Sequence, residues 1–328
     1  MSSTIRFILL SFFLLIPVFT LNAQEPIKVK AKSGDGIHLI LRNHQMNTKE
    51  NYLEFIKLNQ DKLINKDQLI VGETYILPYN KEVKKGRFYE IFGEKYGYVD
   101  IVDNQLKGAI YYLVSGHGGV DPGAIGKRNG HFLTEDEYAY DICLRLAREL
   151  ISHGALVYVI IRDEKEGIRD DDYLVNNKTE TVWKGKEIPL NVNKKLRQRA
   201  QVVNQFYDKN RGAYQRLIVM HIDSRSKSER VDVFGYYNSK SNSGKLFTEQ
   251  LISALRKNYN KYQPNRAFEG ITKSRNGLYM LKYTHPVTAF LELGNIQNPK
   301  DQIRFIKSSN RQAIADWLTE GCINDYNK

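Results

Sequence analysis

The sequence predicts a large α/β domain over residues 109–328, a twisted, mostly parallel sheet flanked by helices, preceded by a small βααβ domain. Short apolar runs alternate with helical patterns in the larger part, and residues 24–79 show a strand, two helices and a strand. The length of 328 residues suffices for two domains, and a hydrophobic content of 41% allows a sizeable core.

Residues 1–23 have the layout of a secretory signal peptide, with Arg6 before an apolar stretch at 7–16 and a polar chain after Ala23. An uncleaved membrane anchor is the alternative. No later apolar run reaches the about 20 residues that span a bilayer. We therefore expect export across the inner membrane to the periplasm, the cell wall or the extracellular space, without stable membrane insertion once the signal is removed.

The small domain is predicted from alternating apolar residues at 27–31, a turn at Ser33–Gly36, and a closing strand within 69–78. Two helical segments lie between the strands, at 37–43 and 48–59. Residues 80–108 begin with a charged stretch and continue with aromatic residues, which predicts a linker or extension with some strand.

Four apolar, β-rich runs in the large domain read as strands that are buried on both faces of a parallel sheet. They lie at 110–114, 156–161, 217–220 and 287–291. Helical patterns between and after them lie at 135–153, 196–208, 244–257 and 310–320. Cys143 falls on the apolar face of the first of these helices, which predicts a buried thiol, and whether it pairs with Cys322 is open.

The formal net charge of +12 favours an anionic partner. Motifs for nucleic-acid binding are lacking, so we expect no nucleic-acid partner. An anionic wall polymer fits the predicted export better.

Chemically versatile side chains follow three of the predicted strands. The first run leads into His117, the third into His221, and the fourth ends at Glu292. Because ligands of open α/β sheets bind at the carboxyl ends of the strands, these three residues should meet at one edge. Two imidazoles and a carboxylate form the ligand set of a catalytic zinc, which keeps a fourth position for water.

The third ligand should be an acidic residue near the two histidines. Glu135 fits, because it opens the first helix of the domain close to the same sheet edge. Glu137 is a rival, and His131 is a weaker one.

Four further residues are candidates for contact with a substrate: Gly118, Gly119, Asp121 and Asp223. The glycines let the backbone turn sharply and approach a substrate closely. Asp121 opens a tight turn with the proline and glycine that follow it. Asp223 could instead orient a metal ligand or face solvent, and we favour solvent.

Several ordered motifs resemble the zinc-dependent N-acetylmuramoyl-L-alanine amidases of the Amidase_3 type. They are HGGVDPGAIG at 117–126, Glu135, RAQVVN at 199–204, His221, and PVTAFLELGNIQNP at 286–299. The small domain resembles a LysM module in its SGDG turn, its Leu58-Asn59 pair and its closing VGETYILP.

The resemblance implies one Zn²⁺ ion held by His117, Glu135 and His221, with Glu292 as the catalytic glutamate. It implies hydrolysis of the amide bond between N-acetylmuramic acid and the L-alanine of the stem peptide in peptidoglycan. A LysM module implies binding to the glycan strands. An activating partner of unknown identity is left open.

The polar stretch at 163–195 is longer than a strand–helix connection requires. It could block the site, shape a groove or lie in solvent, and we favour the last two. Two other functions stay open for the whole chain: a non-catalytic peptidoglycan-binding protein, and a zinc peptidase acting within the stem peptide.

Overall fold

The computed structural model describes residues 26–44, 46, 49–78 and 86–328. The predicted signal peptide at 1–23 lies outside these residues, as do residues 24, 25 and 79–85 at the edges of the small domain and of the following segment. The chain divides into two compact units, Met1–Val83 and Lys84–Lys328, which are described one at a time. No helix in the described part is both long and apolar enough to cross a bilayer.

The described residues of the first unit form two strands and two α-helices in the predicted order. Its elements are β1 (Lys28–Lys30), α1 (Ile37–Asn43), α2 (Lys49–Leu58), the 3₁₀ turn η1 (Gln60–Lys62) and β2 (Thr74–Ile76). β1 and β2 pair antiparallel, and the helices close over a small core that includes Leu41, Phe55 and Tyr75.

Asn59 connects the end of α2 to β2. Its amide nitrogen donates to the carbonyl oxygens of Phe55 (2.8 Å) and Ile76 (2.7 Å), and its side-chain oxygen accepts from the amide of Ile76 at 2.7 Å. The side chain is almost fully buried, so its polar atoms need these partners. The Leu58-Asn59 pair of the sequence therefore has a structural role in this unit.

The second unit is built on a sheet of six strands in the order β14-β13-β15-β12-β5-β8. Their bounds are β5 (Ala109–Ser115), β8 (Leu156–Val159), β12 (Tyr214–Asp223), β13 (Val233–Tyr237), β14 (Gly270–Ser274) and β15 (Val287–Asn295). β15, β12, β5 and β8 are mutually parallel, whereas β13 runs antiparallel to β15. The prediction of a mostly parallel sheet is confirmed.

Every predicted apolar run became a strand, and the second run continues from β8 into the short β9 (Ile161–Arg162). The sequence reading missed β13 and β14. They lie toward one edge of the sheet. β14 (GITKS) is mostly exposed and polar, and β13 (VFGYY) is a short run interrupted by Gly235, so neither reads as a continuous apolar run.

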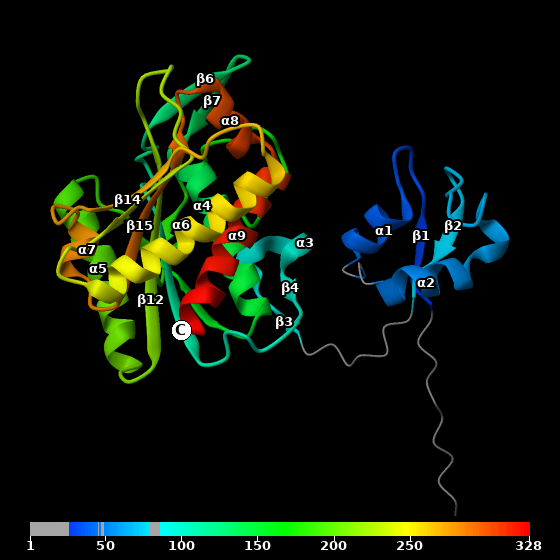
Figure 1. Cartoon of the computed structure of the whole chain (residues 1–328), viewed down its shortest axis with the longest axis horizontal. Helices are drawn as coiled ribbons and strands as arrows, with labels where there is room; N and C mark the ends of the chain where they lie inside the picture. The colour runs from blue at the N-terminus through cyan, green and yellow to red at the C-terminus, as the bar shows by residue number, and fades with distance from the viewer. Residues whose placement is uncertain (1–25, 45, 47–48, 79–85) are drawn as a thin grey trace, which may run out of the picture. The chain divides into compact units, whose positions relative to one another are not determined.

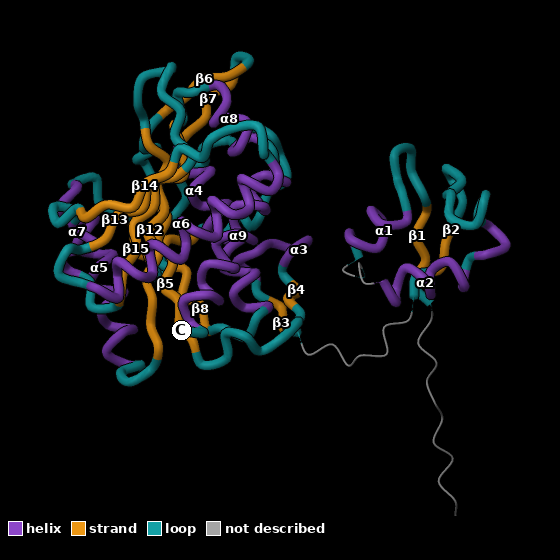
Figure 2. Tube along the Cα trace, viewed as in Figure 1, coloured by secondary structure: helices purple, strands orange, loops and turns teal. Residues whose placement is uncertain are grey.

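Helices cover both faces of this sheet. Their bounds are α4 (Glu135–Ser152), α5 (Val192–Lys209), α6 (Asn242–Tyr262), α7 (Tyr279–Tyr283), α8 (Pro299–Ile306) and α9 (Ser308–Tyr326). α4, α6 and α9 share the larger core on one face, and Figure 1 shows α6 and α9 side by side there. α5 and α7 pack on the other face, and Figure 2 shows the strands gathered between the two helical layers.

Residues 86–108 belong to the second unit. They form β3 (Arg87–Phe88), η2 (Glu90–Phe92), α3 (Gly93–Tyr96) and β4 (Tyr98–Val99). Phe92, Val99 and Leu106 are buried in the larger core together with α4. The segment predicted as a linker or extension with some strand is, in its described part, packed on the α/β unit.

The remaining strands are short and lie outside the central sheet. β6 (Ile125–Arg128) and β7 (His131–Thr134) form a hairpin before α4, and β10 (Thr181–Val182) and β11 (Lys186–Glu187) extend β9. Cys143 and Cys322 are both buried and unpaired.

Candidate metal centre and active site

The carboxyl ends of three neighbouring strands bring His117, His221 and Glu292 to one edge of the sheet. His221 on β12 lies directly opposite Glu292 on β15 in the parallel register. β5 lies on the other side of β12, and the amide of Gly116 after it donates to the carbonyl of Met220 at 2.7 Å. His117 follows at once, so parallel topology gathers residues far apart in the sequence.

The carboxylate of Glu135 spans the two histidines. Its Oε1 lies 2.7 Å from Nδ1 of His221, and its Oε2 lies 3.2 Å from Nε2 of His117. One ligand atom from each of the three residues lies within 4.8 Å of the others. These residues form a group that can hold one metal ion.

Backbone amides fix the position of Glu135 at the start of α4. Oε2 accepts from the amide of Ala124 at 2.9 Å, and Oε1 accepts from the amide of Ile222 at 3.1 Å. Burial raises the pKa of Glu135, but the hydrogen bonds to His117 and His221 outweigh it and hold the pKa well below its ordinary value. The group is therefore an anion, as a metal ligand must be.

Two glycines allow this close packing. A Cβ on Gly116 would lie 2.4 Å from the ring of His221, and a Cβ on Gly123 would lie 2.6 Å from Oε2 of Glu135 and 2.7 Å from the His117 ring. His117 itself has a φ of +53°, in the left-handed region that non-glycine residues rarely adopt. Such strained backbone is characteristic of functional sites.

Asp121 contacts His117. Its Oδ2 lies 2.9 Å from Nδ1 of His117, on the ring nitrogen that faces away from Glu135, and it also forms an ion pair with Lys195. Arg199 binds the carbonyl oxygens of Ser115, at 3.3 Å, and of His117. The contact of Lys195 was not predicted from the sequence. A lysine on a helix usually faces solvent, and its partner Asp121 lies 74 residues away along the chain.

Glu292 lies beside the trio without bonding to it. The residue is partly exposed, yet its Oε2 is buried and finds no hydrogen-bond partner among the described residues. Burial, and then the charge of Glu135, raise the pKa of Glu292 well above its ordinary value. A carboxyl group with these properties is suited to accepting and releasing a proton.

The rival ligands have other partners. Glu137 binds the guanidinium of Arg169 at 2.6 Å and the amide of Asn177 at 3.0 Å. The ring of His131 on β7 stacks on Tyr173 with centroids 4.0 Å apart. Neither residue belongs to the group formed by His117, Glu135 and His221.

Two of the suggested substrate contacts have protein partners as well. Asp223, for which we favoured solvent, is half-buried and binds Nε of Arg225 at 2.6 Å. The amide of Gly119 donates to Oε2 of Glu180 at 2.9 Å. Gly118 and Gly119 have φ values of +102° and +65°, which agrees with the sharp turn expected of them.

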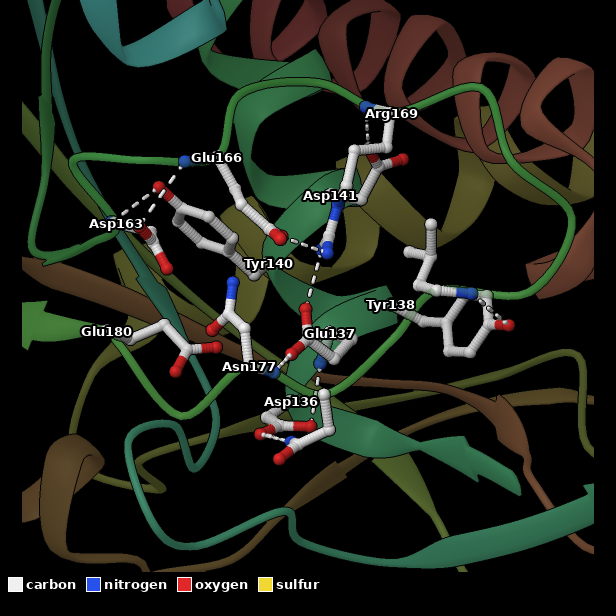
Figure 3. Close-up of polar contacts among 12 residues, drawn as sticks. Asp136, Glu137, Tyr138, Tyr140, Asp141, Asp163, Glu166, Arg169, Asn177 and Glu180 are labelled. Atoms are coloured by element: carbon white, nitrogen blue, oxygen red, sulfur yellow. Dashed lines mark hydrogen bonds and ion pairs between the residues drawn. The ribbon is translucent and has the colours of Figure 1, made fainter. Parts of the chain in front are cut away.

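The long stretch after β9 is ordered and packs on the start of α4, as Figure 3 shows. The Tyr138 hydroxyl donates to the carbonyl of Asp172 at 3.0 Å, and Asn176 donates to Asp136 at 2.7 Å. Further along, Ile188 lies close to Gly118 and Gly119. This segment therefore supports the elements that carry Glu135 and His117.

The family model for N-acetylmuramoyl-L-alanine amidase matches residues 112–324. The germination-specific N-acetylmuramoyl-L-alanine amidase of Bacillus subtilis (strain 168) is 22% identical over 221 residues, covering 67% of this chain and 81% of that protein.

Two solved structures are also similar. The amidase AmiC2 of Nostoc punctiforme has a TM-score of 0.48 and 16% identity, over 67% of this chain and 98% of that one. The CwlD amidase of Clostridioides difficile, solved in complex with the GerS lipoprotein, has a TM-score of 0.48 and 19% identity over the same shares. Since the family model spans most of the chain, the protein belongs to the N-acetylmuramoyl-L-alanine amidase family of peptidoglycan hydrolases.

Proposed function

We propose that this amidase uses one zinc ion to hydrolyse the amide bond between N-acetylmuramic acid and the L-alanine of the stem peptide. The observation that carries the proposal is the convergence of His117, Glu135 and His221 beside Glu292, whose Oε2 is buried without a partner among the described residues.

The donor atoms fit zinc. Two imidazole nitrogens and one carboxylate oxygen are a common ligand set of catalytic zinc, which leaves a further position open for water. The carboxylate–imidazole contact between Asp121 and His117 is the support that zinc-bound histidines usually have. A bound zinc ion lowers the pKa of water to about 7 in favourable sites and polarises a carbonyl group.

The side chains of this protein would perform the remaining steps. Glu292 would accept a proton from the attacking water and deliver it to the nitrogen of the departing L-alanine. Its raised pKa makes the carboxylate of Glu292 a stronger base, which favours uptake of the proton from water. Asp121 would orient the ring of His117, and Arg199 would hold the backbone of the loop that carries it.

We also propose that residues 24–79 form a LysM module that binds peptidoglycan glycan strands. The strand–helix–helix–strand order and the role of Asn59 in joining α2 to β2 support this assignment. A variant lacking residues 24–79 should sediment less with purified sacculi than the full chain does, while its rate on a soluble muramyl peptide stays the same.

Residues 1–23 are proposed to direct export, with action in the periplasm or cell wall. Fractionation of cells that express the chain with and without these residues tests this proposal. Retention of both forms in the cytoplasm would contradict it.

The main test of the function is product identification. Purified protein is stripped with a chelator, assayed on sacculi, and assayed again after addition of Zn²⁺. Mass spectrometry should show intact stem peptides with a free L-alanine amine and sugars with free lactyl groups, in the zinc-restored sample alone. Shortened peptides still attached to sugar would indicate a peptidase, and sacculus binding without any product would indicate a binding protein.

A further inference from the structure

A groove of about 450 Å³ opens over β13 and β14 and has no role in the mechanism described above. Its lining includes two aromatic rings and three cations: Arg225, Phe234, Tyr236, Lys273 and Arg275. β13, β14 and the residues that directly follow β12 and β14 supply these side chains. Such a surface, with aromatic rings and cations, suits a ligand that carries negative charge.

The strand register connects the groove to the catalytic glutamate. Glu292 on β15 lies opposite Phe234 on β13, which lies opposite Ile271 on β14. In the next matching row, Phe290 lies opposite Tyr236, which lies opposite Lys273. Residues directly opposite one another point to the same face of a sheet, so Glu292 lies on the face that carries the groove, one strand away from Phe234. Two strand spacings place Lys273 roughly 10 Å across the sheet from β15.

The charge of the groove is only partly balanced by the protein. Arg225 forms ion pairs with Asp223 at 2.6 Å and with Glu229 at 2.9 Å. Lys273 and Arg275 are exposed, and neither forms an ion pair with any carboxylate in the described part of the chain. The guanidinium of Arg275 lies over the ring of Tyr236, 5.1 Å from its centroid. Two positive charges therefore remain available to an anionic ligand.

The two sides of the scissile amide differ in charge. On the sugar side, the lactyl carboxyl of muramic acid is consumed in the amide, so that side is neutral. On the peptide side, the stem peptide carries free carboxylates beyond the L-alanine. An extended chain advances about 3.3–3.6 Å per residue, so the second and third residues reach the distance of Lys273 and Arg275.

We propose that this groove is the stem-peptide subsite, and that Lys273 and Arg275 bind a free carboxylate of the peptide beyond its L-alanine. The inference rests on the proposed function. The rings of Phe234 and Tyr236 form the apolar floor under the peptide, and the two cations set the preference for a charged over an amidated stem. Lys273 and Arg275 are specificity-determining residues, and they take no part in the proton transfer.

The test compares two soluble muramyl peptides that differ only in free or amidated carboxyl groups at the second and third residues. The wild-type protein should have a KM about tenfold lower for the free carboxylate, with a similar kcat, because a charge-assisted hydrogen bond contributes this much. Lys273→Gln/Arg275→Gln should lose this discrimination, and Lys273→Gln alone should weaken it and keep its kcat on the amidated substrate, because the charge of Arg275 also acts on Glu292. Lys209→Gln/Arg211→Gln, a matched pair near the opposite ends of the strands, should behave as wild type.

Each outcome decides the proposal. Wild-type protein that cleaves both substrates with equal KM would overturn the subsite while leaving the amidase function intact. The subsite is likewise excluded if the double variant still discriminates by KM, or if Lys273→Gln loses kcat equally on both substrates. Absence of cleavage of either substrate by zinc-loaded wild type would refute the proposed function itself. Because the wild-type comparison needs no mutant, a folding defect in the double variant would not remove the test, and each single variant repeats it.

Discussion

The rings of His117 and His221 meet edge to face, with centroids 5.1 Å apart and planes inclined at 81°. His221 lies on β12 and His117 follows the adjacent parallel strand β5, and each ring turns one nitrogen toward the same carboxylate, that of Glu135. The ring of His221 also stacks on Phe290 at 4.8 Å, which limits its rotation. The fold thus holds the atoms that are proposed to bind zinc close together.

Replacing Glu292 with Gln should abolish most hydrolysis and leave zinc binding intact. The amide keeps the shape of the side chain but cannot accept the proton, and general base catalysis is worth about 10²–10⁴-fold. Single-turnover rates on a muramyl peptide and zinc content by mass spectrometry measure the two effects. The exposed Glu187→Gln serves as the control. A variant that loses its zinc would show that Glu292 acts as a ligand.

Asp121→Asn should weaken zinc binding by about 10–100-fold, the usual effect of removing a carboxylate behind a ligating histidine. The carboxylate lies 2.9 Å from Nδ1 of His117 and anchors the ring from the side opposite to Glu135. Titration against a chromophoric chelator measures the affinity. Unchanged affinity together with a raised KM would instead support the substrate contact suggested by the sequence.

Alanine at Gly116 or Gly123 should disrupt the metal centre more than its small size suggests. The added Cβ would lie 2.4 Å from the His221 ring in the first case and 2.6 Å from Oε2 of Glu135 in the second. Both variants should bind zinc less tightly. Gly130→Ala tests backbone strain alone, because its φ is +83° and nothing lies within 4 Å of the added atom. If Gly130→Ala lost as much zinc affinity, contact with the ligands would not be the cause.

Arg169→Ala should lower the free energy of unfolding by about 3 kcal/mol, since it leaves a buried carboxylate without its ionic partner. The guanidinium binds Glu137 at 2.6 Å, and the Glu137 side chain is 1% exposed. Burial already raises the pKa of Glu137 to about 7 in spite of Arg169. Urea unfolding measures the change. Arg211→Ala, which removes an exposed pair with Asp208, should change stability by less than about 1 kcal/mol.

Asp232 should contribute stability that is lost in acid. Burial raises its pKa, but the hydrogen bond to Arg266 and the charge of Arg304 prevail and lower it below the ordinary value of 3.8. A carboxylate with a lowered folded-state pKa stabilises the protein fully above its unfolded pKa, and the effect disappears as the pH falls through the folded-state value. Asp232→Asn should therefore be destabilising at pH 7, and less so near pH 2. An equal loss of unfolding free energy at both pH values would contradict this.

Patterns of apolar residues predicted the four parallel strands and four principal helices of the α/β unit. Such runs are long and uniform, because a strand buried on both faces has no polar side. β14 escaped this reasoning because Lys273 and its neighbours are exposed, and β13 because Gly235 interrupts its short apolar run. These two strands supply most of the lining of the proposed stem-peptide subsite. The residues proposed to select the substrate therefore lie on the strands that the apolar pattern predicted least well.

Sequence order and residue chemistry by themselves determined the family resemblance, the sheet class, and the expectation that His117, His221 and Glu292 share one edge, because the carboxyl ends of parallel strands always lie together. Only the tertiary structure decided how Glu135 differs from Glu137. The carboxylate of Glu135 contacts both imidazoles, whereas that of Glu137 binds Arg169. It also decided that Asp121 contacts His117 and that Asp223 pairs with Arg225. Partners so distant along the chain are selected by packing, and packing leaves no local pattern in a sequence.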